Sequence, residues 1–192
     1  TLSPEEMRSE LSLREQAISA VEAARGRLTL VEDGYFKLID AGIEIVLFFE
    51  EGYPERLNRL MKNEAPSMLY VYGNRSLLRE KSAAVLGEKA VSEKGELVAY
   101  RAAQELVRHR IAVTSGFARG VDLIAHRAAL ENGGGTIGVL PHGFSQLKMP
   151  DSMKETYNPN FMLLVSPFGF DTEYSTFNAF RRNRLACALS RT

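Results

Sequence analysis

The sequence has little that would suit an oxidising compartment or a membrane. Its 192 residues include one cysteine, Cys187, so no internal disulfide can form, and we expect this lone thiol to be buried. The longest apolar run, Ile45 to Phe49, is too short to cross a bilayer. The N-terminal stretch TLSPEEMRSE is charged where a signal peptide would be apolar. These absences predict a soluble, cytoplasmic protein with no membrane partner.

The sequence also lacks the residues of several common catalytic sites. No P-loop of the form GxxxxGK[ST] is present, so ATP turnover is not expected. No group of His, Cys and Asp has the spacing of metal ligands. We therefore predict no catalytic residue, no metal ligand and no cofactor.

There is no net charge, but the charges are unevenly distributed along the chain. Residues 1–55 contain 12 acidic and 5 basic residues, whereas residues 56–192 contain 12 acidic and 19 basic residues. The larger part can therefore create a local positive field that attracts a polyanion, although a mixed, solvated surface would give the same composition.

Residues 1–42 are predicted to form a short helical N-terminal segment. Ser3 and Pro4 have the residue types of a helix start, and Gly26 is a plausible end for that helix. A second short helical stretch is expected over residues 35–41.

Residues 43–192 are predicted to form a second domain, in which short apolar strands alternate with helices. The helix beginning at Ser92 has two adjacent apolar stripes at four-residue steps, namely Val98, Ala102 and Leu106 on one face and Ala99, Ala103 and Val107 beside them. The alternation predicts an α/β fold with an open, mostly parallel sheet and helices on both faces. Strands are expected at 43–49, 68–72, 83–86, 111–114, 136–140 and 161–165, and helices at 53–60, from 92 onward and at 121–130.

In such sheets, ligands bind outside the carboxyl ends of the strands. Three glycine-bearing loops follow predicted strands, at residues 87–89, 115–120 and 141–143. Glycine lets backbone N–H groups approach a phosphate, and the start of a following helix adds partial positive charge. These loops predict an anion-binding edge.

The stretch from Ser115 to His126 resembles the signature SGxARGxDxxAH of the DNA-processing protein A (DprA/Smf) family. Residues 134–140, 53–57, 69–74 and 178–184 are similar to further elements of that family. The resemblance implies a Rossmann-like fold and binding of single-stranded DNA without strong sequence preference. It also implies delivery of that DNA to a RecA-type recombinase during natural transformation, and a homodimer.

Three features depart from the family pattern. Lys89 replaces an arginine that suits phosphate better, and Glu88 adds a negative charge beside it. Ala179 and Phe180 replace a phenylalanine and a proline. The family's domain continues beyond the position of Thr192, so residues 43–192 are expected to be either a fragment of that domain or a shortened form of it.

The loops and the resemblance together define candidate residues for contact with DNA or phosphate. Asp122 could instead be a helix cap, and His126 could be a structural residue that locks the loop rather than one that faces a pocket. The candidates are Gly87, Lys89, Ser115, Gly116, Arg119, Gly120, Asp122, His142, Gly143, Arg182, Asn183 and Arg184.

The C-terminal stretch from Tyr174 contains no acidic residue and several arginines. Aromatic residues lie just ahead of those arginines, among them Phe177 and Phe180. Cations that follow a backbone and aromatics that stack on bases are typical of single-strand binding, whereas core packing would be the structural alternative.

Two other functions remain open from the sequence. Related Rossmann-like folds include nucleotide-binding sensors and nucleotide N-glycoside hydrolases, and Glu88 could be the carboxylate of such a hydrolase. The PGGxGTxxE-type motif of those hydrolases is absent. Steep salt dependence would distinguish DNA binding from a buried nucleotide site.

Overall fold

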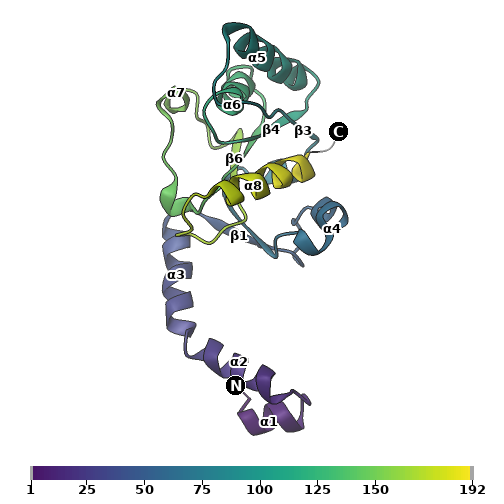
Figure 1. The fold of residues 1–192 in the computed structure, drawn as a ribbon, viewed down its shortest axis with the longest axis vertical. Coiled ribbons are helices and arrows are strands. Elements are labelled where there is room, and N and C mark those ends of the chain that lie inside the picture. Colours follow the sequence, from purple (N-terminus) through teal and green to yellow (C-terminus); the bar gives the residue numbers. More distant parts are fainter. Residues whose placement is uncertain (1, 191–192) are drawn as a thin grey trace. The chain divides into compact units, whose positions relative to one another are not determined.

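The computed structural model describes residues 2–190, and for residues 28–31 it describes the backbone only. The chain divides into two compact units, residues 1–42 and 43–192 (Figure 1). The first unit contains the helices α1 (Pro4–Ser9), α2 (Glu15–Arg25) and α3 (Leu28–Asp40). The prediction of one helix from Ser3 to Gly26 is wrong. That stretch forms two helices, and Ser12 between them has a left-handed backbone with a φ of 51°.

The start of α1 follows the sequence prediction. The Ser3 side chain accepts a hydrogen bond from the backbone N–H of Glu6 (3.2 Å), and the Glu6 carboxylate accepts one from the N–H of Ser3 (2.6 Å). This reciprocal pair satisfies two of the N–H groups that a helix start leaves without partners.

The second unit is built on one six-stranded sheet, with the strand order β1-β2-β6-β5-β4-β3. Strands β3 to β6 are parallel to one another, which confirms the prediction of a mostly parallel sheet. The first two strands pair antiparallel at one edge. The strands are β1 (Glu44–Leu47), β2 (Met68–Gly73), β3 (Ser82–Ala84), β4 (Ala112–Gly116), β5 (Thr136–Val139) and β6 (Met162–Ser166).

Helices α4 to α6 were predicted from the sequence, whereas α7 and α8 were not. The polar and arginine-rich composition of α8 hides its helical period, because only part of one face is apolar. The helices of this unit are α4 (Glu55–Met61), α5 (Glu93–Arg108), α6 (Val121–Glu131), α7 (Asp151–Lys154) and α8 (Thr176–Leu189), with short 3₁₀ turns η1 (Lys62–Glu64), η2 (Arg75–Arg79) and η3 (Phe144–Gln146).

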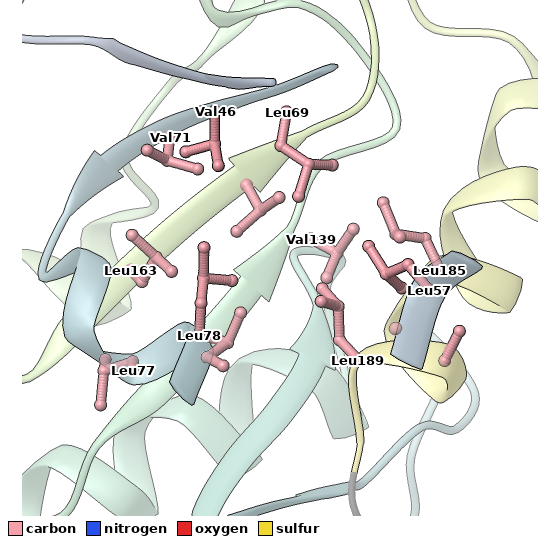
Figure 2. Close-up of a cluster of buried hydrophobic side chains, with 14 of the residues drawn as sticks. Val46, Leu57, Leu69, Val71, Leu77, Leu78, Val139, Leu163, Leu185 and Leu189 are labelled. Carbon is pink, nitrogen blue, oxygen red and sulfur yellow. The ribbon is translucent and has the colours of Figure 1, made fainter. Parts of the chain in front are cut away.

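The two faces of the sheet carry separate apolar clusters. Along β4, Val113 packs with alanines of α5 and α6, whereas its neighbour Ala112 belongs to the cluster on the other face. That second cluster includes Leu57 of α4 and Leu185 of α8, which lie side by side (Figure 2). Side chains alternate across a strand, so helices cover both faces, as predicted.

On α5 the structure decides between the two apolar stripes of the sequence: Ala99 and Ala103 are buried, whereas Val98 and Ala102 are exposed. Apolar periodicity alone cannot decide which of two adjacent apolar stripes meets the sheet. The expectation of a buried Cys187 is wrong. Cys187 is exposed, because it lies on the side of α8 that points away from the sheet.

We expect Leu57→Ala to lower the free energy of unfolding by about 2–5 kcal/mol, because Leu57 is fully buried between α4 and α8 and its truncation leaves a cavity. The matched control is Leu60→Ala on the same helix, where the side chain is 57% exposed and the change should stay within about 0.5 kcal/mol. Urea unfolding followed by circular dichroism measures both; equal effects would contradict this packing.

Candidate nucleic-acid interface

The first two predicted loops meet at the carboxyl ends of β3 and β4. Gly120 has a φ of 85°, and a Cβ added to it would lie 2.2 Å from the Glu88 carbonyl oxygen. The same oxygen accepts a hydrogen bond from the N–H of Val121 at the start of α6 (3.2 Å). A Cβ on Gly87 would meet the Val121 side chain at 2.6 Å. Glycine is therefore needed at both positions, at Gly120 because backbone packs against backbone and at Gly87 because the Val121 side chain packs against it.

The side chains of these two loops have different exposures. Lys89 and Arg119 are exposed, so both cations are accessible to a phosphate. Ser115 is buried, and its hydroxyl donates to the Val85 carbonyl (2.5 Å), which joins the ends of β3 and β4. The structure thus gives Ser115 an internal hydrogen bond, and its contact with phosphate stays a prediction.

The third loop is part of a separate packing arrangement. Gly143 is buried, and its N–H donates to the Thr172 carbonyl (2.8 Å). The Ser166 hydroxyl donates to the His142 carbonyl (2.8 Å), so this loop is held to the chain that follows β6. His142 is partly buried. Phosphate binding by His142 and Gly143 stays a prediction.

A buried ion pair lies beneath the loop after β4. Arg182 of α8 donates through one terminal nitrogen to Asp122 of α6 at 2.9 Å, and both side chains are almost fully buried. A Cβ on Gly116 would lie 1.0 Å from that nitrogen, so the pair occupies the space that a side chain at Gly116 would need. Asp122 and Arg182 therefore connect two helices internally, and direct DNA contact by either stays a prediction.

His126 is fully buried beneath the same loop. Its Nε2 donates to the Gly116 carbonyl, since a carbonyl oxygen only accepts, and Nδ1 lies 2.7 Å from the Thr136 hydroxyl. The Thr136 hydroxyl also lies 2.9 Å from the Val113 carbonyl oxygen. When the ring is neutral, Nδ1 is an acceptor, so Nδ1 and this carbonyl oxygen share the one hydroxyl hydrogen. Burial lowers the pKa of His126, which favours the neutral ring. His126 is thus a structural residue that locks the loop.

Exposed aromatic residues and cations lie close together around the start of α8, and we call them the basic-aromatic surface: Lys89, Tyr174, Phe177, Phe180 and Arg181. Phe177 and Phe180 are 70% and 67% exposed, so the alternative of core packing is wrong for both. The Lys89 ammonium lies 5.8 Å from the Tyr174 ring centre, and the Arg181 guanidinium lies 5.9 Å from that of Phe177. These contacts are within cation–π range.

The remaining predicted residues of α8 are exposed. Arg184 forms an ion pair with Glu64 of η1, and Asn183 lies beside it on the helix. Arg181 and the three aromatics were not among the candidate site residues. The signal for them was present as a run of aromatics before arginines, but their common exposure follows only from the helix α8, which the sequence did not reveal.

Within residues 2–190, no group of three or more His, Cys, Asp or Glu side chains is placed to hold a metal ion. In the same described part of the chain, none of the helices is both long enough and apolar enough to span a bilayer.

Gly116→Ala should lower the free energy of unfolding by about 3 kcal/mol or more, because the new methyl group would displace Arg182 from Asp122 and leave buried charges unpaired. Gly169→Ala is the control: the loop after β6 offers its Cβ only an ordinary contact at 3.6 Å. Denaturant unfolding measures the stability of both variants. If Gly116→Ala is as stable as the wild type, the Asp122–Arg182 ion pair does not pass over Gly116 at the end of β4.

The buried, neutral His126 should make stability depend on pH. Because its folded pKa is lowered, the unfolded chain takes up a proton as the pH falls through about 6.5 and the folded chain does not. The free energy of unfolding should therefore decrease toward lower pH, with a slope of up to about 1.4 kcal/mol per pH unit down to the folded pKa. His126→Gln should lose this contribution, and His109→Gln, at the exposed end of α5, should keep it. Urea unfolding between about pH 7.5 and 5.5 gives the pH dependence of the free energy of unfolding for each variant. If this slope is the same for both variants, on the order of one proton taken up on unfolding, the assignment is contradicted.

Comparison with known proteins places this geometry in a family. Residues 44–192 match the family described as DNA recombination-mediator protein A. The chain is 32% identical over 166 residues to DNA processing protein DprA of Streptococcus pneumoniae, covering 82% of this chain and 57% of the relative. It is 33% identical over 147 residues to protein Smf of Escherichia coli, covering 73% of this chain and 38% of that relative.

Solved structures agree with the sequence relatives. The crystal structure of DprA from Streptococcus pneumoniae superposes with a TM-score of 0.70 at 27% identity, covering 99% of this chain and 65% of that one. DNA processing protein A from Helicobacter pylori, reported with its single-stranded DNA binding mode, gives a TM-score of 0.65 at 25% identity, covering 77% of this chain and 66% of that one. With a match over most of its length and a shared fold, the chain belongs to the DNA recombination-mediator protein A family, the DprA/Smf family that its motifs resemble.

Proposed function

We propose that this chain binds single-stranded DNA without strong sequence preference, as part of a DNA-processing protein that delivers the strand to a RecA-type recombinase during natural transformation. The observation that carries the proposal is the basic-aromatic surface, where Phe177 and Phe180 are exposed beside Arg181. Every base has a ring face that can stack on an aromatic side chain, and cations follow the phosphates, so such a surface binds strands with little regard to sequence.

The loops at the carboxyl edge complete this binding surface in our proposal. Lys89 contacts the Tyr174 ring and so belongs to both the first loop and the basic-aromatic surface. Arg119, in the next loop, is exposed. Its guanidinium can donate two hydrogen bonds at once to the oxygens of one phosphate. The reported single-stranded DNA binding of the Helicobacter pylori relative supports this assignment.

The proposed role is binding rather than catalysis. Of the acid–base groups in the family signature, Asp122 is held in a buried ion pair and His126 is buried between Gly116 and Thr136, so neither can reach a substrate. A general acid or base must lie within hydrogen-bond reach of the proton that it transfers.

The recombinase partner, the homodimer and the cytoplasmic location belong to the same proposal. The family's description as a recombination mediator supports the recombinase partner. The homodimer is what the family resemblance implies, and the cytoplasmic location is proposed with it. The chain spans 57% and 38% of the two relatives named above, so the activity of the whole protein is proposed by analogy with them.

Fluorescence anisotropy with a labelled oligo-dT strand tests this function. We expect binding that weakens as salt is added, and a loss of roughly 1–3 kcal/mol, about 5- to 150-fold in Kd, for Phe177→Ala because a stacking platform is removed. Arg119→Ala should weaken binding and reduce the slope of log Kd against log salt by about 0.7.

The matched control is Phe161→Ala, an exposed phenylalanine that precedes β6 at the opposite, amino edge of the sheet. Its Kd should equal that of the wild type. No binding by the wild type at low salt, or equal effects of Phe177→Ala and Phe161→Ala, would refute the proposed function; salt-insensitive binding of a small nucleotide would favour the sensor alternative.

A further inference from the structure

Three neighbouring hollows adjoin α4 on the face of the sheet opposite α5 and α6, and we call them together the α4–α8 groove. Its largest hollow, about 670 Å³, is lined by α4 and η2 and ends at Ser190. A second hollow of about 430 Å³ shares Leu60 with the first and is lined on its other side by α8. A small third hollow shares Met61 and Arg184 with the second and reaches Arg181. The shared residues place the three hollows next to one another along the surface.

The lining of this α4–α8 groove is rich in arginine. Its three hollows are lined by four exposed arginines, namely Arg59, Arg79, Arg181 and Arg184, and by the buried Arg56, against two glutamates, Glu55 and Glu64. Arginine carries a planar fork that matches the two oxygens of a phosphate. A groove with this excess of positive charge suits an anionic chain.

The acidic partners in and near the groove are held weakly. Arg184 pairs with Glu64 and Arg79 lies 3.8 Å from Glu51, and all four side chains are more than half exposed. Exposed ion pairs of this kind contribute about 0–1 kcal/mol, so a phosphate can take the place of the glutamate at little cost.

The groove is continuous with the basic-aromatic surface. Arg181 belongs to both: its guanidinium lies over Phe177 and it also lines the third hollow. From Arg181 to Leu189, α8 rises about 12 Å along the groove. A strand whose bases stack on Phe177 and Phe180 can therefore enter the groove without leaving the protein surface.

We propose that the α4–α8 groove binds the sugar–phosphate backbone of the same DNA strand beyond the basic-aromatic surface, with Arg59 and Arg79 as phosphate contacts at its far end. This inference rests on the proposed function and extends it to a second binding segment. The groove has no exposed aromatic in its lining, so it contacts the backbone and not the bases. It therefore adds affinity and salt dependence only for strands long enough to reach it.

The length of the DNA oligonucleotide distinguishes binding at the basic-aromatic surface from binding in the α4–α8 groove. Anisotropy is measured with oligo-dT strands of roughly 6 and roughly 30 nucleotides, which bracket common single-strand site sizes. For Arg59→Ala we expect the long strand to bind roughly 3- to 10-fold more weakly and its salt slope to fall by about 0.7, because one phosphate contact is lost. Binding of the short strand should stay unchanged.

Asn58→Ala is the matched control, because Asn58 is the exposed neighbour of Arg59 on α4 and does not line the three hollows. It should alter neither Kd, and circular dichroism should show the same fold for both variants. An unchanged long-strand Kd in Arg59→Ala, or equal weakening of both strands, would overturn the groove while leaving the proposed function intact.

Two further outcomes are decisive. If the wild type binds neither strand, the proposed function itself fails. If a polyglutamate peptide binds the wild type but not Arg59→Ala, and strand length has no effect on the Kd, the groove holds an acidic protein segment and the DNA path is refuted.

Discussion

The ion pair between Asp122 and Arg182 connects elements that lie on opposite faces of the sheet. Asp122 is in the first turn of α6, whereas Arg182 comes from α8, sixty residues later in the chain. The pair passes over the end of β4, and the space for it exists because Gly116 has no side chain. Removing one member of a buried pair costs about 3–5 kcal/mol, so each charge depends on the other for its burial.

The position of α8 determines which of its residues face solvent. Consecutive residues on a helix point about 100° apart, so the burial of Arg182 directs Arg181 and Asn183 outward on either side. Arg181 then meets the ring of Phe177, and the loop that carries Lys89 lies beside Tyr174. The buried pair therefore supports the exposed surface to which we assign DNA binding, although it does not belong to that surface.

The neutral net charge of the chain results from local pairing and does not mean that positive surfaces are absent. Part of the acidic excess of residues 1–55 is used by neighbouring arginines: Arg75 pairs with Glu44 and Glu50, and Arg79 lies near Glu51. The arginines of the α4–α8 groove and of α8 still outnumber the acids around them. A polyanion responds to this local field and not to the total.

The sequence by itself determined the family, the α/β alternation and the two glycine loops, because these depend on local chemistry: apolar strands, helix starts, and glycines where another part of the chain packs too closely for a side chain. Only the tertiary structure decided which charges are buried. Arg182 and Arg184 have the same chemistry and lie two residues apart, yet one is sealed against Asp122 and the other is exposed beside Glu64. Their difference arises from the packing of α8 on the sheet. That packing depends on contacts with residues far away in the chain, which no local pattern encodes.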